Sequence, residues 1–351
     1  MGKGTLTKTE SAALRGLAIL GIVLHNYCHW LGLAVKENEY TFDLDKSHRL
    51  WWILQHPDMY LPVHLLSFFG HYGVPVFLFL SGYGLFKKYE NDAERVGAWP
   101  FIRVHYLKLL RIMIVGFVLF TMLDAITPGR HPYQAWDIIA QIGMFINILP
   151  HPDHIIWPGP YWFFGLMMEL YLVYRWVLYR RSPWITVALV VLCWLMQAVC
   201  MPESEALNRI RYNFTGGMLP FGAGLLYARK EVTMGKRGYA VVALLSTIAV
   251  FACGFHFHLW LWIPLFVVTG CVSMVRLLPD SLLKILAWTG NISAALFVTH
   301  PLVRKVFIPI SRQGDVYAGL LLYLIACIAL AWAAEMLMKK IPTPQLKRKT
   351  P

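Results

Sequence analysis

An arginine and a histidine, Arg15 and His25, stand ten residues apart in the first apolar segment of the chain. Ionisable side chains are costly inside a lipid bilayer, so each of the two is by default a candidate for function. Ten residues of helix rise about 15 Å, which is roughly half the thickness of a bilayer core. The spacing therefore predicts Arg15 near one membrane surface and His25 well inside the membrane.

His25 is of the residue type that acyl transfer to an alcohol requires. A histidine can take a proton from a hydroxyl group near neutral pH. Arg15, Ala18, Ile22, His25 and His29 recur at intervals of three and four residues, which places them on one face of a helix. The alternative for His25 is a hydrogen bond between helices. His29 is expected to be structural, because it lies nearer the interface.

The second apolar segment runs HYGVPVFLFLSGYGLFKK and combines a histidine with small residues, namely His71, Ser81 and Gly82. Small residues leave room for a ligand against the backbone, but they are also how membrane helices ordinarily pack. The segment taken alone favours packing.

The third apolar segment begins with basic side chains, Arg103, Lys108 and Arg111. Lys108 and Arg111 are three residues apart and so share a helix face. Two interpretations stand side by side. The cations anchor the helix among lipid headgroups, or they form a pocket for phosphates such as those of a nucleotide-bearing acyl donor.

Two later segments also place polar residues in apolar surroundings. The sequence PGPYWFFGLMMELYLVY contains Trp162 and Glu169, and a carboxylate there needs a cationic partner or a substrate hydroxyl. In NISAALFVTHPLV, His300 stands just before Pro301, close to the predicted outer surface. His300 either belongs to a site or only caps a helix at the interface.

The composition predicts that these segments cross a membrane. Hydrophobic residues make up 58% of the 351 residues, charged residues 15%, and the mean hydropathy is +0.53. A water-soluble domain of this composition would expose far too much apolar surface. We expect an all-α, polytopic helical bundle with about ten membrane-spanning helices. Their predicted bounds are 9–33, 62–86, 101–125, 160–179, 184–201, 214–228, 239–254, 259–278, 285–302 and 317–338.

Basic residues predict the orientation of the bundle. With the amino terminus in the cytoplasm, 23 of the 32 lysines and arginines fall on the inner side. This bias predicts that both termini are cytoplasmic. It also accounts for the net charge of +13 through anionic lipid, without nucleic acid as a partner. We expect a membrane domain over 1–338 and a basic, disordered tail over 339–351.

Other features narrow the chemistry. Thr7 and Glu10 form a capping-box pattern, which predicts that the first segment is a retained helix. The six cysteines are scattered without a CxxC pair, so neither a disulfide framework nor a metal site is predicted from them. The loop 126–160 carries an apolar run, Trp136 to Leu149, that is too short to span. We expect an interfacial or re-entrant helix there, or a lid on the bundle.

The order of these motifs resembles the acyltransferase type 3 family, integral-membrane O-acyltransferases of envelope glycans and some other acceptors. The resemblance rests on Arg15-x10-His25, on GVPVFLFLSGYGLF, on the basic start of the third segment, on the stretch from tryptophan to glutamate, and on NISAALFVTHPLV. It covers nearly the whole chain. Where the family often has Arg-x-x-Arg, this chain has Lys108-x-x-Arg111. The positive charge is kept, but one bidentate phosphate contact is lost.

The resemblance implies a transferase that uses cytoplasmic acyl-CoA, by default acetyl-CoA, as co-substrate, with no tightly bound cofactor and no metal. It implies His25 as the catalytic residue and Arg15 as a donor-binding residue. The donor site is expected to include Ser81 and Gly82 with the bases of the third segment, whereas His71, Trp162, Glu169 and His300 are expected to bind or support the acceptor.

The implied acceptor is a glycan or lipid-linked sugar at the bacterial cytoplasmic membrane, reached directly or through a separate extracytoplasmic partner protein. Two hypotheses compete: a membrane sensor or scaffold that keeps the fold without catalysis, and a transporter of a glycan or small molecule, which would also contain intramembrane His, Arg and Glu. No repeat symmetry between the halves of the chain supports the transporter.

Overall fold

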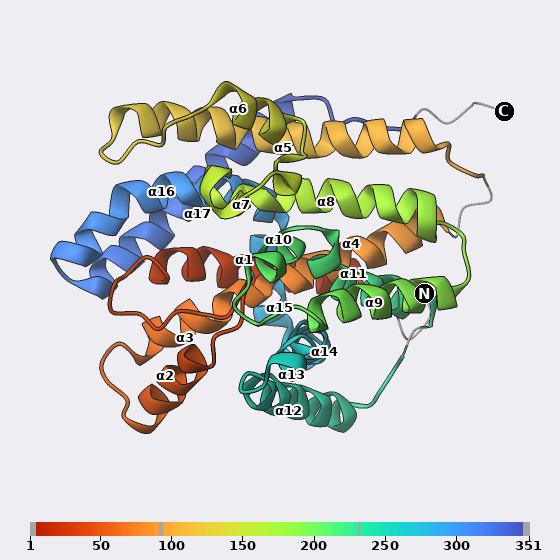
Figure 1. Ribbon diagram of the computed structural model, residues 1–351, viewed down its shortest axis with the longest axis horizontal. Coiled ribbons are helices and arrows are strands. Elements are labelled where there is room, and N and C mark those ends of the chain that lie inside the picture. Colours follow the sequence, from red (N-terminus) through yellow and green to blue (C-terminus); the bar gives the residue numbers. More distant parts are fainter. Residues whose placement is uncertain (1–4, 91–93, 231, 347–351) are drawn as a thin grey trace.

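The computed structural model describes residues 5–90, 94–230 and 232–346, and over these residues it contains helices and no strands (Figure 1). The α-helices are α1 (Lys8–Cys28), α2 (Leu44–Gln55), α3 (Leu61–Phe69), α4 (Gly73–Tyr89), α5 (Ala98–Ile126), α6 (Ala135–Ile142), α7 (Pro152–Ile155), α8 (Trp162–Val173), α9 (Pro183–Ala198), α10 (Glu205–Tyr212), α11 (Phe214–Arg229), α12 (Lys236–Cys253), α13 (Phe257–Trp260), α14 (Ile263–Val275), α15 (Asp280–Asn291), α16 (Ser293–Gln313) and α17 (Val316–Lys340). Short 3-10 or π turns, η1 (Gly70–Tyr72), η2 (Ile146–Ile148), η3 (Gly159–Tyr161) and η4 (Tyr174–Leu178), join several of them.

Six stretches in the described residues are long and apolar enough to cross a membrane: α1, the unit from α3 to α4, α5, α12, α16 and α17. Two further apolar helices, α9 and α14, are shorter. The expected all-α membrane bundle is therefore confirmed, but the expected count of about ten spans is not. The segment predicted at 285–302 is divided at Ile292 between α15 and α16.

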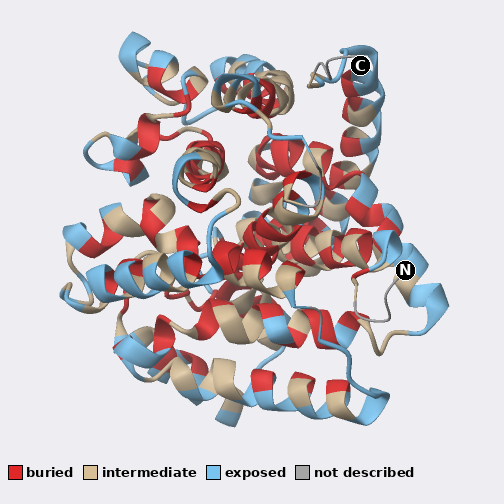
Figure 2. Cartoon of the chain, turned by 90° about the vertical axis from the view of Figure 1, so that its right-hand side faces the viewer, coloured by how far each residue is buried: buried red, intermediate tan, exposed pale blue. Residues whose placement is uncertain are grey.

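The outer faces of the bundle are apolar, as contact with lipid requires. In the most apolar 18-residue stretch of α12, only 17% of the residues are buried inside the molecule. The corresponding share is 33% in α5 and in α17. The exposed face of α12 carries Leu244, Leu245 and Ile248. Figure 2 shows buried residues concentrated at the centre of the bundle and exposed ones on the peripheral helices. Such surface is stable only against hydrocarbon, so the chain is an integral membrane protein.

Helix α1 lies in the middle of this bundle. Its first turn has the predicted capping box, in which the Thr7 hydroxyl accepts from the Glu10 amide at 3.0 Å and the Glu10 carboxylate accepts from the Thr7 amide at 2.7 Å. Glycines let α1 touch α15 backbone to backbone. A Cβ at Gly16 would lie 1.9 Å from the Leu286 carbonyl oxygen, and one at Gly290 would lie 1.8 Å from that of Ala12.

The loop 126–160 is more broken than predicted. Helix α6 ends after eight residues, and η2 replaces the rest of the expected helix up to Leu149. The break follows from the backbone, because Met144 adopts a φ of 59°, outside the right-handed helical region. Helices α2 and α10, both amphipathic and on the predicted outer side, are additional elements that the apolar pattern did not predict.

The end of the chain is tied to α5. Helix α17 continues to Lys340, two residues past the predicted end of the membrane domain at 338. The guanidinium of Arg111 donates to the Thr343 hydroxyl at 2.7 Å and to the Met338 carbonyl oxygen. The described part of the tail runs along α5 (Figure 1). The remaining predicted tail, 347–351, lies outside the described residues.

Candidate active site

His25 lies in the last turn of α1 and is 6% exposed. Its Nδ1 is 2.7 Å from the carbonyl oxygen of Ser67 on α3. A carbonyl oxygen only accepts, so Nδ1 carries the proton and the neutral ring has its lone pair on Nε2. The approach of α3 depends on Gly70, because a Cβ there would lie 2.6 Å from the Cβ of His25. The fold therefore fixes one tautomer of the imidazole.

Glu37, in the loop between α1 and α2, lies beside the free nitrogen of this ring. One carboxylate oxygen is 3.9 Å from His25 Nε2 and the other is 2.8 Å from His29 Nδ1. Burial alone would raise the pKa of Glu37, but the hydrogen bond from His29 and the charges of the neighbouring histidines hold that pKa below its usual range. Glu37 is therefore an anion held next to His25.

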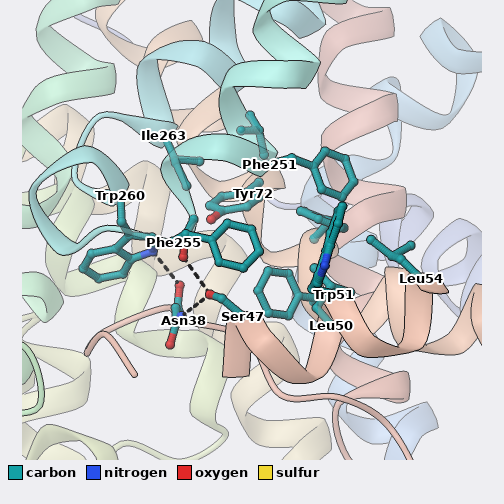
Figure 3. A pocket seen from close by; sticks show the side chains of 14 residues that line it. Asn38, Ser47, Leu50, Trp51, Leu54, Tyr72, Phe251, Phe255, Trp260 and Ile263 are labelled. Atoms are coloured by element: carbon teal, nitrogen blue, oxygen red, sulfur yellow. Dashed lines mark hydrogen bonds between the residues drawn. The ribbon is translucent and has the colours of Figure 1, made fainter. Parts of the chain in front are cut away.

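A hydrogen-bonded clamp holds the loop that carries Glu37. Asn38 donates through Nδ2 to the Ser47 hydroxyl at 3.3 Å, and Ser47 donates to the Gly254 carbonyl oxygen at 2.7 Å. The Trp260 indole donates to the Asn38 carbonyl oxygen at 3.2 Å. Figure 3 shows Asn38 between Trp260 and Ser47, with Phe255, which follows α12, and Trp51 of α2 to one side. The loop is thus attached to α2 and to the segment between α12 and α14.

Ser67 joins the clamp to His25. Its hydroxyl donates to the Val35 carbonyl oxygen at 2.7 Å, while its own carbonyl oxygen accepts from His25. A single residue of α3 thus contacts both the imidazole and the loop that bears Glu37. The relative position of His25 and Glu37 follows from this shared contact.

A cavity of about 340 Å³ opens in front of these groups. It is the size of a small-ligand pocket. Polar side chains from α1 and the following loop share it with aromatic ones from α8 and α10; among its lining residues are His25, His29, Glu37, Glu39, Tyr40, His71, Trp162, Tyr212 and Arg304. Burial raises the pKa of Glu39 to about 8, with a further contribution from the charge of Glu37. One cavity therefore contains a base, an anion and a broad aromatic surface.

The aromatic residues of the cavity wall stack on one another. Tyr40 stacks on Tyr212 with ring centroids 4.0 Å apart, and Trp162 meets both rings edge to face at 5.5 and 5.7 Å. Aromatic side chains of this kind combine an apolar face with a polar group at the rim. The wall suits a ligand whose surface is also part apolar and part hydroxylated.

Arg304 of α16 places a buried cation in the same cavity. It is 7% exposed, lies over the Trp30 ring at 4.8 Å and is 3.4 Å from both oxygens of Asn26. No ion pair with a carboxylate joins it among the residues that the structure describes. The sequence interpretation missed Arg304, although its position four residues after His300 in an apolar helix was a usable signal.

The predicted acceptor residues divide between this cavity and its surroundings. His71 and Trp162 line it, and their role toward an acceptor stays a prediction. His300 is fully buried behind it, against Phe297, with Nδ1 3.1 Å from the Leu296 carbonyl oxygen. Glu169 lies elsewhere: it accepts from the Phe214 amide at 2.8 Å and caps the start of α11. Glu169 does not line the cavity of His25, and its role toward an acceptor stays a prediction.

The predicted donor residues are spread over three helices. Arg15, on α1, forms no hydrogen bond or ion pair within the described part of the chain, whereas Arg111 is engaged by the tail as described above. Ser81 donates to the Phe77 carbonyl oxygen of its own helix at 2.8 Å. A Cβ at Gly82 would lie 2.2 Å from the Phe221 carbonyl oxygen, so Gly82 allows α4 to touch α11.

Arg103 and Lys108 complete the set on α5. Arg103 is exposed and Lys108 is half-buried. Neither residue lines the cavity of His25. The predicted grouping of these cations with Arg15 around phosphates is therefore not formed by direct contacts, and their role in donor binding stays a prediction.

Comparison with known proteins identifies the family to which the chain belongs. Residues 11–336 match the family model described as an acyltransferase domain, which is nearly the whole chain. The match includes α1 with His25, the cavity and most of α17. A search of curated proteins and a search of solved structures each found no match. The chain belongs to the acyltransferase type 3 family of membrane proteins.

Proposed function

We propose that the protein transfers an acyl group from acyl-CoA to a hydroxyl group of a glycan or another acceptor at the membrane. The observation that carries the proposal is the setting of His25. Its Nδ1 is fixed to the Ser67 carbonyl oxygen, which leaves Nε2 free beside Glu37 in a cavity large enough for a small ligand. A base, an anion that supports it and room for a substrate are what the reaction needs.

The chemistry follows from this arrangement. His25 Nε2 takes the proton of the acceptor hydroxyl as its oxygen attacks the thioester carbonyl carbon. The gap of 3.9 Å between Nε2 and the Glu37 carboxylate lets the carboxylate stabilise the imidazolium that forms. The carbon–sulfur bond then breaks, and the imidazolium returns its proton to the departing CoA thiolate. Protons and charges balance over the cycle, and no tightly bound cofactor is needed.

The two substrates are proposed to arrive from opposite sides. Cytoplasmic acyl-CoA, by default acetyl-CoA, would meet Arg15 and the cations of α5 with its phosphates. The acceptor would enter the cavity beside the loops of the predicted outer side and lie on the wall of Tyr40, Trp162 and Tyr212. A lipid-linked or growing glycan at the bacterial cytoplasmic membrane fits such a wall. The acyl group passes to it directly or through a separate extracytoplasmic protein.

The test is acyl transfer or donor hydrolysis by purified protein in lipid nanodiscs with radiolabelled acetyl-CoA. His25→Ala is expected to lower the rate by about 100-fold or more, the usual contribution of a general base. Glu37→Gln keeps the shape but removes the charge, so a smaller loss is expected. His56→Ala is the matched control, since His56 is exposed at the end of α2 and, among the described residues, its side chain hydrogen-bonds only the Trp52 carbonyl oxygen. A His25→Ala protein that is folded and as active as the control contradicts the proposal.

A further inference from the structure

Three possible metal-ligand residues lie together in the wall of the cavity. His25 Nε2, His29 Nδ1 and the Glu37 carboxylate all lie within 4.8 Å of one another. The two histidines are one helical turn apart at the end of α1, and Glu37 reaches them from the following loop. The cysteine pattern pointed away from metal binding, and this cluster was not visible in the sequence because the loop must fold back to form it.

We propose that this cluster is a site for a divalent transition-metal ion of the Zn²⁺ type. Two imidazole nitrogens and one carboxylate are a ligand set that Zn²⁺ accepts when the fourth position stays open. Here the fourth position faces the cavity. Neutral imidazole favours Zn²⁺ and its neighbours over Mg²⁺ and Ca²⁺, which prefer sets made wholly of oxygen.

The distances suit such an ion. The ligand atoms of Glu37 are 2.8 Å from His29 and 3.9 Å from His25. Bonds of about 2.0–2.1 Å to a tetrahedral ion place neighbouring ligand atoms roughly 3.4 Å apart. Because one ligand atom from each residue lies within 4.8 Å of the others, the side chains would move by about an ångström to hold the ion.

Contacts outside the cluster already orient its ligands. Metal-bound histidines commonly donate their other ring N–H to a carbonyl or carboxylate oxygen. His25 does so toward Ser67 at 2.7 Å, which leaves Nε2 as the metal-facing atom. The clamp through Asn38, Ser47 and Trp260 holds the Glu37 loop in the same way. The site is thus supported before any ion arrives.

The consequence for activity rests on the proposed function. An ion at Nε2 occupies the lone pair that His25 needs to accept a proton, so metal binding and general-base catalysis exclude each other. Zn²⁺ is therefore an inhibitor that acts at the active site, and a chelator restores transfer.

The experiment measures binding and activity separately. Purified protein in nanodiscs is stripped with EDTA, and Zn²⁺ binding is followed by equilibrium dialysis, with the visible spectrum of bound Co²⁺ reporting coordination geometry. The background carries His256→Gln and His258→Gln, because those two rings lie 5.6 Å apart and offer a second weak site. One ion per chain is expected. His29→Ala and Glu37→Gln each weaken its binding by about tenfold or more, while His56→Ala binds like the background protein.

The outcomes separate the two proposals. Unchanged Zn²⁺ affinity in folded His29→Ala and Glu37→Gln proteins overturns the metal site, whatever the protein catalyses. If Zn²⁺ binds at the cluster and has no effect on acyl transfer, the metal site is supported. The mutual exclusion of metal binding and catalysis is then contradicted, and with it the role of His25 Nε2 as the base. Zn²⁺ binding in a protein that transfers no acyl group supports the site and contradicts the proposed function alone.

Discussion

Arg304 is the residue whose position is hardest to explain by folding alone. A buried guanidinium in a membrane helix is costly unless an anion compensates it. Its described contacts are the Trp30 ring and the Asn26 oxygens, which are neutral. Because it lines the same cavity as His25, the missing anion is best supplied by a ligand or by the charge that develops during acyl transfer.

Arg304→Met tests this. We expect transfer to fall by about 10-fold or more, as loss of a charge-stabilising donor does, while the unfolding temperature in detergent stays the same or rises. Arg304 pairs with no carboxylate among the described residues, so its replacement leaves no buried carboxylate unpaired. For this reason we do not expect the stability to drop. Arg49→Met, on α2 and exposed, is the control, because Arg312 donates to the carbonyl oxygen of Trp30 at the same cavity. A large loss of stability together with unchanged transfer would show that the charge serves the fold.

The cavity residues divide into those that the sequence could predict and those that it could not. His25, His71 and Trp162 belong to apolar helical motifs, and helical periodicity places such residues with useful accuracy. Glu37 and Tyr40 reach the cavity only because the loop after α1 folds back over it. No local pattern encodes that return, because it depends on Asn38 and Ser47 contacting residues more than two hundred positions away.

At the scale of elements, glycines set the spacing of the central helices. The pair Gly16 and Gly290 joins α1 to α15, and Gly82 with Gly224 joins α4 to α11, where a Cβ at Gly224 would lie 2.1 Å from the Phe79 carbonyl oxygen. The apolar pattern predicted both membrane helices α1 and α4, but it did not predict these contacts or the break at Ile292. A period of 3.6 residues defines a face without naming its partner.

Gly290→Ala is expected to destabilise the bundle. Its new methyl group would meet the Ala12 carbonyl oxygen at 1.8 Å, which forces α1 and α15 apart. The expected cost is about 1–3 kcal/mol, typical of overpacking. Gly84→Ala is the matched control, because nothing lies within 4 Å of its Cβ position. Thermal unfolding in detergent, followed by intrinsic fluorescence, checks both; equal midpoints for the two variants would contradict the close contact.

At the scale of the whole molecule, charge and cavity lie on opposite sides. Most lysines and arginines fall on the predicted inner face, whereas the His25 cavity is covered by the loop 29–43 and the segment before α8. Under the proposed function, an acyl group carried by cytoplasmic acyl-CoA would travel about half the bilayer to reach His25. The proposed separation of the donor side from the acceptor side requires both termini to be cytoplasmic.

Labelling with a membrane-impermeant thiol reagent tests the orientation. In a variant with the six native cysteines replaced, Asp58→Cys, just after α2, is expected to react in intact cells. Arg181→Cys, between α8 and α9, is expected to react only after the membrane is opened. Both positions are exposed, so equal labelling in detergent is the control. The reverse pattern would invert the bundle and remove the proposed separation of donor and acceptor.

The attachment of the tail to α5 has a consequence for donor affinity. Thr343 and the Met338 carbonyl oxygen occupy hydrogen-bond donors of Arg111 that a phosphate would otherwise use. Met338 and Thr343 thus compete for one of the cations that the proposed function assigns to acyl-CoA. Under the proposed function, Thr343→Ala would free part of that guanidinium for the donor phosphates and lower the Michaelis constant for acyl-CoA.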